Sequence, residues 1–403
     1  MEVNLDNCSK YFPLLKREVH GKPIIYLDSA ATSIRPQSVI DAVVKFYTQY
    51  SAGISRAVHI LSEEATEAFE TSRDRIAHFI NADSREIAFM HNATQALNVV
   101  AASELKSGLV MHPLSEHHSN LLPWRQGEVM VLPVSTEGRM DVDASKAAIA
   151  KYKPKILALS TISNALGVRH PVHELTQAAH SVGARVILDV SQSVGHEVVD
   201  MQDLDCDYAC FSGHKMFGPN GLGVLYRKEG IANDLEPLIY GGSMVHAVHE
   251  ADFELRPYPW NLEAGSPNVE AVVGLVAACD FIEEIGLEAI HQHCNTLTQY
   301  AREKLSATPG VTLHGAQDKD QSSIISFSVE GTPANGVARI LSNRFNIMVR
   351  SGYHCAQPLH EACGIPETVR ASVHVYNTLQ DIEHLVEAVG IVSKMGKQSA
   401  DGP

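Results

Sequence analysis

The sequence of 403 residues has few features of a membrane, nucleic-acid-binding or disulfide-bonded protein. Residues 1–22 contain neither a basic stretch followed by an apolar block nor a run near the roughly 20 apolar residues that cross a bilayer. Lysine and arginine are scarce, 32 against 47 aspartates and glutamates, and the net charge of -15 repels a polyphosphate backbone. The seven cysteines are an odd number without a C-x-x-C pair, which argues against a disulfide framework and a zinc ribbon. We therefore expect a cytoplasmic protein with no membrane and no nucleic-acid partner.

The composition is that of a soluble globular protein, with 45% hydrophobic and 20% charged residues. Between residues 37 and 228, apolar runs of strand length alternate with amphipathic stretches of helical length. Predicted strands cover residues 86–90, 108–112, 128–134, 155–161, 185–190, 207–212 and 223–228, and predicted helices cover 39–50, 65–80 and 171–182, the last followed by Gly183. This repeated order predicts an α/β fold with a mostly parallel, doubly wound sheet.

After residue 260 the pattern changes to that of a smaller α+β domain. A long helical region at 268–307, broken near Gly286, precedes further strands and helices. The predicted strands are 311–315, 323–330, 346–350 and 368–375, and the predicted helices are 333–343 and 378–395, the second with Thr378 and Asp381 in capping-box spacing. We predict an N-terminal arm (1–20) that packs with the small domain, a large domain (21–285) and a small C-terminal domain (286–403).

The usual nucleotide-binding signatures are missing. The sequence contains no G-x-x-x-x-G-K-[ST] motif, and the glycine-rich run 218–223 precedes a strand, in the wrong order for a dinucleotide fingerprint. Thr94 follows the predicted strand 86–90 and begins a helical pattern, so its hydroxyl and the neighbouring N–H groups suit an anion. An ordinary helix N-cap is the alternative. A phosphate-bearing cofactor other than ATP or NAD stays open.

Asp189 falls where a predicted apolar strand ends, and Lys215 comes just past another, at the edge where an α/β sheet binds its ligands. A desolvated lysine has a lowered pKa and can form a Schiff base, although a lone lysine is usually a solvated surface cation. A carboxylate at the end of an apolar strand needs a cation or donors, and a protonated pyridine nitrogen is such a cation. The pair therefore favours a pyridine-based cofactor.

His117 lies in the run 115–120, after the predicted strand 108–112, and offers a flat face that can stack on an aromatic ring. A surface pair of His117 with His118 and a zinc site are the alternatives. Zinc needs three or four convergent ligands, and no other histidine or cysteine spacing completes a known pattern. We therefore expect no metal.

The order of these residues resembles that of a known family. Asp189-x-x-Gln192, then Ser212-Gly-His-Lys215, then Arg350-x-Gly-x-His-Cys355-Ala resembles the pyridoxal-phosphate (PLP) enzymes of aminotransferase class V. More narrowly, the chain resembles the Suf-type (group II) cysteine desulfurases over nearly its whole length, from 26–32 to 369–372 and 376–378. The resemblance implies the type I fold of PLP-dependent transferases, a large PLP-binding domain, a small domain that carries the Cys355 loop, and a homodimer.

The resemblance also implies a role for each matching residue. Lys215 would form the Schiff base with PLP, Asp189 would contact the pyridinium nitrogen, and His117 would stack on the ring. The remaining contacts would be Gln192 to the phenolic oxygen, Thr94, Ser212 and His214 to the phosphate, Ser266 to the phosphate from the other subunit, and Asn164, Arg350 and Arg370 to the substrate. For Arg370 the chemistry agrees, because a guanidinium holds a carboxylate in a two-pronged, charge-assisted fork.

Cys355 lies in a predicted loop, 350–358, between two strands. The neighbouring Arg350 and His354 are cations that lower a thiol pKa in the right geometry. A buried, inert cysteine is the alternative, and we keep that interpretation for the other six. The resemblance implies that Cys355 takes the sulfur of L-cysteine as a persulfide, releases L-alanine, and passes the sulfur to a protein acceptor. Iron–sulfur cluster assembly is one such use of sulfur.

Several positions depart from the family pattern. Ala57 stands where a glycine usually follows Arg56, the run 91–95 (His-Asn-Ala-Thr-Gln) replaces an Arg-Gly-Thr-Thr-Glu-like run, and Ser191 and Ser266 replace alanine and threonine. These departures leave open a selenocysteine lyase that acts on L-selenocysteine, or another class V lyase or aminotransferase. An aminotransferase would not need Cys355. A non-catalytic PLP-binding sulfur-relay partner is the alternative from another class of protein.

Overall fold

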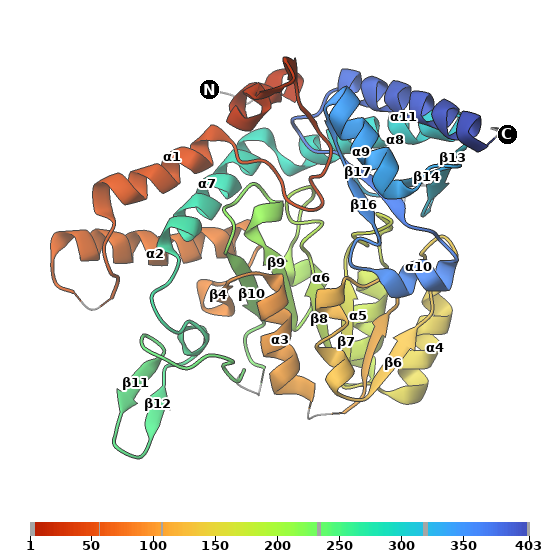
Figure 1. The fold of residues 1–403 in the computed structure, drawn as a ribbon. Coiled ribbons are helices and arrows are strands. Elements are labelled where there is room, and N and C mark those ends of the chain that lie inside the picture. The colour runs from red at the N-terminus through yellow and green to blue at the C-terminus, as the bar shows by residue number, and fades with distance from the viewer. Residues whose placement is uncertain (1–4, 56, 106–107, 232–234, 317–320, 401–403) are drawn as a thin grey trace.

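The computed structural model describes residues 5–55, 57–105, 108–231, 235–316 and 321–400 (Figure 1). Its centre, within these residues, is a seven-stranded sheet in the order β4–β10–β9–β8–β7–β5–β6. The strands are β4 (Ile87–Met90), β5 (Val110–Pro113), β6 (Val129–Leu132), β7 (Ile156–Ser160), β8 (Arg185–Asp189), β9 (Tyr208–Ser212) and β10 (Gly223–Arg227). Neighbours from β9 to β6 pair in parallel, and β10 is antiparallel to both β4 and β9. The predicted α/β fold with a mostly parallel sheet is therefore confirmed.

Each of the seven predicted strand segments overlaps one of these strands. Four of the strands, β4, β5, β7 and β9, are buried at every residue, because helices cover both faces of a parallel sheet. The helices of this part are α1 (Gln37–Lys45), α2 (Ile60–Phe79), α3 (Ala93–Glu104), α4 (Val142–Tyr152), α5 (Val172–Ser181), α6 (Met201–Leu204) and α7 (Val269–Ile285). Figure 1 shows α1, α2 and α7 lying together beside the β4 edge of the sheet.

The C-terminal part forms a second, smaller α+β unit, drawn in teal to blue at the upper right of Figure 1. Its described residues include a four-stranded antiparallel sheet in the order β13–β14–β17–β16. The elements are α8 (Leu287–Ser306), β13 (Val311–His314), β14 (Ile324–Val329), α9 (Ala334–Phe345), β15 (Ile347–Met348), β16 (Arg350–Gly352), α10 (Gln357–Cys363), β17 (Thr368–Ser372) and α11 (Leu379–Ala400).

Local signals in this unit agree with the sequence at two places and differ at one. The predicted helix 268–307 is interrupted by Gly286, whose φ of 90° most side chains avoid. Thr378 and Asp381 form the predicted capping box, with the Asp381 carboxylate 2.9 Å from the Thr378 amide. The predicted single strand 346–350 is instead two short strands, because β15 pairs with the N-terminal β3 (Ile25–Tyr26) while β16 pairs with β17.

The N-terminal segment contacts both parts of the molecule. The Phe12 ring packs 5.5 Å from Phe217 and 5.6 Å from Phe281 of the large part, and 4.8 Å from Tyr376 of the small part. Two further short strands, β1 (Glu18–Val19) and β2 (Lys22–Pro23), pair with each other before β3. Residues 1–4 lie outside the described residues, and the boundaries 1–20, 21–285 and 286–403 stay predictions.

A hairpin of β11 (Val245–Val248) and β12 (Phe253–Leu255) projects from the body at the lower left of Figure 1. None of the described helices is both long enough and apolar enough to span a bilayer.

Candidate active site

A pocket of about 210 Å³ lies between the ends of the central strands and the C-terminal unit. It is lined by Ala30, Ala31, Asn92, Ala93, Thr94, His117, Ser119, Asn164, Asp189, Ser191, Ser212, His214, Lys215, Arg350, His354, Cys355 and Arg370. All of the site residues predicted from the sequence line this pocket except Gln192 and Ser266. Side chains that are far apart in the chain, such as Thr94 and Arg370, therefore share one cavity.

Lys215 ends a short 3-10 turn, Gly213–Lys215, that directly follows β9. Desolvation lowers the pKa of its amine, the Arg370 charge acts in the same direction, and the Asp189 charge partly offsets both. The glycines that follow this turn allow close backbone packing, because a Cβ on Gly218 would lie 2.9 Å from the Gly213 carbonyl oxygen and a Cβ on Gly223, at the start of β10, would lie 2.5 Å from the backbone of Asn92. The glycine-rich run after Lys215 therefore serves close packing, and the lysine amine is held in a dry environment that favours its neutral form.

Asp189 is the last residue of β8 and is only 8% exposed. Its Oδ1 accepts a hydrogen bond from the Ser191 amide at 3.0 Å. Around it, Asn164 Oδ1, Ser191 Oγ and Arg370 Nε are buried and make no hydrogen bond with any described residue. Buried polar atoms are costly when unpaired, so these three atoms mark a surface that suits a polar ligand.

The N-terminus of α3 forms the end of the pocket that suits an anion. Asn92, and not Thr94, caps this helix, because the Asn92 Oδ1 accepts from the Gln95 amide at 2.9 Å. Thr94 is therefore free to use its hydroxyl elsewhere, and it lies 2.7 Å from the Ser119 hydroxyl. The Ser212 hydroxyl accepts from the Ala93 amide at 2.9 Å. Amide and hydroxyl groups thus gather at the positive end of a helix dipole.

The two histidines that line the pocket from the large part, His117 and His214, have lowered pKa values and are uncharged near neutral pH. Burial lowers the pKa of His117 to about 4, with the Lys215 charge as the next cause, and burial likewise lowers the pKa of His214 to about 4. The His117 Nδ1 accepts from the Ser119 amide at 3.1 Å, which leaves the proton on Nε2. His117 therefore presents a neutral ring of defined tautomer. The His117 and His118 rings lie 6.3 Å apart.

Cys355 lies in the turn between β16 and α10, in an unusual backbone conformation. His354 and Cys355 have φ values of 52° and 59°, in the left-handed region that non-glycine residues seldom adopt. Contacts from the large part hold this turn, because the Asn164 side-chain amide donates to the His354 carbonyl at 2.6 Å and the His118 amide donates to the Cys355 carbonyl at 2.8 Å. Hydrogen bonds from Asn164 and His118 to the backbone of this turn thus hold the Cys355 thiol at the pocket.

Two expectations about the cysteines need correction. His354 is not a cation, because burial lowers its pKa to about 2, and its Nε2 pairs with the Thr368 hydroxyl at 2.9 Å. Cys363 is partly exposed, whereas the sequence interpretation had it buried, and its thiol lies 3.2 Å from the Ser135 carbonyl. Cys8, Cys206, Cys210, Cys279 and Cys294 are buried as expected. Among the described cysteines, Cys355 alone lines the pocket.

Arg370 is the best-anchored cation of the pocket. It is 2% exposed, donates to the Asn164 carbonyl at 2.7 Å and lies 3.4 Å from the Asp28 carboxylate. Arg350 stands opposite it in register between β16 and β17. Sequence reasoning assigned no role to Asp28 because its partner is 342 residues away. The two guanidinium groups give the pocket a site for a carboxylate.

The two remaining predicted residues lie elsewhere. Gln192 is buried and donates to the carbonyl of Ala30, which lines the pocket, at 3.0 Å, but Gln192 itself is not among the lining residues. Ser266 lines a different cavity of about 320 Å³, together with Leu238 and Ile239. A serine expected to act in the partner subunit's site need not line its own, and both roles stay predictions. Arg56 lies outside the described residues.

The described residues hold one group of three potential metal ligands, His196, Cys294 and His374. The two histidine rings stack with centroids 4.0 Å apart and 25° between planes. The His374 Nδ1 accepts the Val375 amide at 3.0 Å, so its proton sits on Nε2, which then has no lone pair for a metal. The geometry is that of an aromatic stack.

The fold and this pocket define a class of enzyme with its ligand site at the carboxyl edge of a parallel sheet. The family model described as Aminotransferase class-V matches residues 25–385, and the chain belongs to this family, whose members are PLP enzymes. A probable cysteine desulfurase from Halalkalibacterium halodurans is 40% identical over 400 residues, which are 96% of this chain and 97% of that protein. A cysteine desulfurase from Pectobacterium atrosepticum is 39% identical over 98% of this chain and 99% of its own.

Two solved structures are similar over almost the whole chain. The apo structure of a cysteine desulfurase from Thermococcus onnurineus superposes with a TM-score of 0.91, at 36% identity, over 99% of both chains. The cysteine desulfurase CsdA from Escherichia coli superposes with a TM-score of 0.87, at 32% identity, over 97% of this chain and 99% of its own. The predicted family is confirmed, and the narrower Suf-type assignment stays a prediction.

Proposed function

We propose that this chain is a PLP-dependent cysteine desulfurase that converts L-cysteine to L-alanine and leaves a persulfide on Cys355. The proposal is carried by one observation: Lys215 and Asp189 of the large domain and Cys355 of the small domain line the same pocket. The names of the similar proteins, cysteine desulfurases at 39–40% identity, support it.

The pocket fits PLP by its chemistry. Lys215 would carry the cofactor, Asp189 would pair with the pyridinium nitrogen, and the neutral His117 ring would stack on it. The phosphate suits the α3 N-terminus with Thr94, Ser212 and His214, while Gln192 would contact the phenolic oxygen and Ser266 would come from a partner subunit. Bound PLP supplies an electron-withdrawing ring that stabilises negative charge at the substrate Cα.

The protein's own groups then bind and orient the substrate. Arg370, fixed by Asp28 and by the Asn164 carbonyl, offers the substrate carboxylate a rigid fork, and Arg350 adds a second positive charge. Asn164 Oδ1, buried and without a partner among the described residues, is a further acceptor for the substrate. The lowered pKa of Lys215 makes its amine a base that can remove the proton at the substrate Cα.

Cys355 performs the sulfur transfer. Its thiolate attacks the sulfur of L-cysteine, so that an S–S bond forms while the substrate Cβ–S bond breaks. The electron pair of the broken bond passes to Cβ, which is protonated as the product leaves. L-cysteine and the enzyme thiol thus give L-alanine and an enzyme persulfide, with no external oxidant or reductant.

The test compares two partly exposed cysteines. Cys355→Ala should keep the yellow colour of bound PLP. With L-cysteine it should neither release alanine nor form protein-bound sulfane sulfur above background. Cys363→Ala, which removes a thiol outside the pocket, is the matched control and should behave like the wild type. Unchanged persulfide formation in Cys355→Ala would refute the assignment.

The same assay separates the alternatives. An aminotransferase would keep its turnover after thiol alkylation, and a selenocysteine lyase would act on L-selenocysteine but not on L-cysteine. A non-catalytic sulfur-relay partner would yield no alanine. The presence of Lys215, Asp189 and Cys355 in one pocket favours the desulfurase over all three.

A homodimer, a protein sulfur acceptor and a cytoplasmic location complete the proposal. Leu238, Ile239 and Tyr240 are 46%, 53% and 60% exposed beside the Ser266 cavity, an apolar surface that a second copy would cover. A single species with the mass of one chain in sedimentation velocity at micromolar concentration would contradict the dimer. A cytoplasmic location agrees with a catalytic thiol that must stay reduced.

A further inference from the structure

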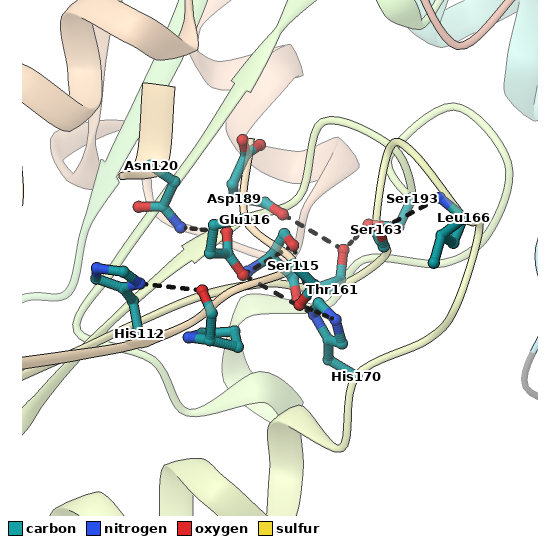
Figure 2. Close-up of polar contacts among 12 residues, drawn as sticks. His112, Ser115, Glu116, Asn120, Thr161, Ser163, Leu166, His170, Asp189 and Ser193 are labelled. Atoms are coloured by element: carbon teal, nitrogen blue, oxygen red, sulfur yellow. Dashed lines mark hydrogen bonds and ion pairs between the residues drawn. The ribbon is translucent and has the colours of Figure 1, made fainter. Parts of the chain in front are cut away.

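Glu116 is a buried carboxyl group beneath the wall of the pocket, and the function proposed above gives it no role. Its side chain is 0% exposed. Oε1 accepts from the Ser160 amide at 2.8 Å and lies 3.0 Å from the Ser160 hydroxyl, and Oε2 accepts from the Asn120 side-chain amide at 2.6 Å. Figure 2 shows the Glu116 side chain in the middle of this network, with Asn120 on one side and Thr161 and His170 on the other.

The orientation of each partner is fixed. The Trp124 indole donates to Asn120 Oδ1 at 3.0 Å, and an indole N–H can only donate, so Asn120 must turn its NH₂ group toward Glu116. His170 lies 3.9 Å from Glu116 Oε1 but is uncharged, because burial lowers its pKa to about 4. Glu116 is thus held by directed hydrogen bonds and by no cation within the described residues.

Ser115, His170 and Glu116 resemble a hydrolytic triad at first sight. The Ser115 hydroxyl lies 2.9 Å from His170 Nε2, while His170 Nδ1 lies 2.7 Å from the Ser160 carbonyl. Ser115 and Glu116 are 0% exposed, so no substrate can reach this serine. The network is therefore a support structure and not a second active centre.

The groups that Glu116 connects are walls of the pocket. Glu116 directly precedes His117 in the chain. Its partner Ser160 stands opposite Asp189 in the register of β7 and β8. Its other partner, Asn120, belongs to the short turn that contains Ser119, and Ser119 bonds to both His117 Nδ1 and Thr94. One carboxyl group therefore joins the His117 segment, the strand end next to Asp189 and the turn beside the anion-binding end.

We propose that Glu116 is a positioning residue of this active site, which acts through His117 and Asp189 by holding the 115–120 segment against the end of β7. The expected effects on PLP binding and on kcat rest on the proposed function, whereas the expected effect on the position of His117 does not. Glutamine is nearly the same size but offers one acceptor oxygen, so Glu116→Gln must turn an NH₂ group toward either the Ser160 amide or the Asn120 amide. Two donors then face each other, and the segment must shift.

The experiment measures His117 directly, in full-length protein with and without PLP. Nitrogen-15 NMR of the imidazole, assigned by loss of the signal in His117→Gln, should show a single tautomer protonated at Nε2 in the wild type. Glu116→Gln should give a mixture of tautomers, weaken PLP binding about tenfold and lower kcat about 10- to 100-fold, the scale expected for a misplacement near 1 Å. Ser160→Ala removes one of the three contacts, and it should shift the same signals less.

The matched control is Glu86, another buried carboxyl group, which accepts from the Asp83 and Glu229 amides far from the pocket. Glu86→Gln should lower stability and leave the His117 signal and PLP affinity unchanged. If Glu116→Gln changes only stability, as Glu86→Gln does, the proposal is overturned. A wild type that makes no alanine would instead overturn the proposed function, while the His117 signal without PLP still decides the role of Glu116.

Discussion

The two sides of the pocket are built in different ways. On the side of the large part, Asp189 ends β8 and Lys215 follows β9, two strands that pair in parallel, and the residues behind them are tied into a buried network through Glu116. On the side of the C-terminal part, Cys355 lies in a turn with two successive left-handed residues and is partly exposed. The position of this turn depends on hydrogen bonds that its backbone accepts from Asn164 and His118 of the large part.

The difference matches what each side has to do under the proposed function. A cofactor bound in one orientation requires rigid neighbours, which strand ends supply. A thiol that takes sulfur from a substrate and hands it to another protein must meet solvent, and loops at the surface of a rigid scaffold allow this. We call the side with Asp189 and Lys215 the wall, and the segment with His354 and Cys355 the turn. We therefore expect changes in the wall to affect cofactor binding and changes in the turn to affect sulfur transfer alone.

The largest effect is expected from a substitution in the wall itself. Lys215→Ala removes the amine that would hold PLP, so the protein should stay colourless after incubation with PLP and show no mass increase at position 215 after borohydride reduction. Alanine formation should fall on the order of 10⁴-fold or more, because both cofactor attachment and the base are lost. Lys228→Ala, a lysine ion-paired with Asp205 at the protein surface, should behave like the wild type. A coloured, active Lys215→Ala variant would contradict the assignment of the wall.

The wall was easier to predict from the sequence than the turn, for a physical reason. Parallel strands buried on both faces leave continuous apolar runs, and the residue after each run is at the ligand-binding edge. Lys215 and Asp189 could be found in this way. The left-handed conformation of Cys355 leaves no such signal, because contacts from Asn164 and His118, remote in sequence, impose it.

Glu116 and β3 are two further features that could not be predicted from the local sequence. Glu116 belongs to a polar run that reads as exposed, and only the donor groups of Ser160, 44 residues away, make its burial possible. The two-residue strand β3 forms because β15 lies beside it, and two residues carry no periodicity. The burial of Glu116 and the formation of β3 both depend on partners far along the chain, and for this reason neither could be predicted from the sequence.

A smaller effect concerns the stability of the wall. Burial raises the pKa of Glu116 to about 8, against its ordinary 4.5, and the Asp189 charge adds to this while bonds from Ser160 and Asn120 offset part of it. Between these two pH values the folded chain holds a proton that the unfolded chain has lost. The contribution of Glu116 to the free energy of unfolding is therefore fully present below pH 4.5. As pH rises from there through about 8, this contribution falls by about 1.4 kcal/mol per pH unit.

Urea unfolding of the wild type and Glu116→Gln from pH 5 to 9 measures this difference. His170, whose pKa is shifted the opposite way, is present in both proteins and cancels from the comparison. The wild type should lose stability relative to Glu116→Gln as pH rises. A constant gap between the two proteins would mean that Glu116 ionises at its ordinary pKa.

The smallest expected effect is confined to the turn. Thr368→Val keeps the shape of a buried β17 side chain but removes the hydroxyl that pairs with Nε2 of His354. The other ring nitrogen of His354, Nδ1, already has no partner among the described residues. An unpaired buried group costs about 1–3 kcal/mol, which weakens the hold on the left-handed turn. Persulfide formation on Cys355 should slow about fivefold, since about 1 kcal/mol in a barrier is worth that factor. PLP affinity should stay unchanged, because the wall is untouched.

Thr298→Val is the control for this change. Thr298 is also buried, in α8 of the C-terminal part, but its hydroxyl makes no hydrogen bond within the described part of the chain. Its replacement should leave both persulfide formation and PLP binding as they are. If Thr368→Val weakened PLP binding as much as it slowed sulfur transfer, the two sides of the pocket would be one mechanical unit. If instead only the sulfur step slowed, the turn could be altered independently of the wall, as their different construction implies.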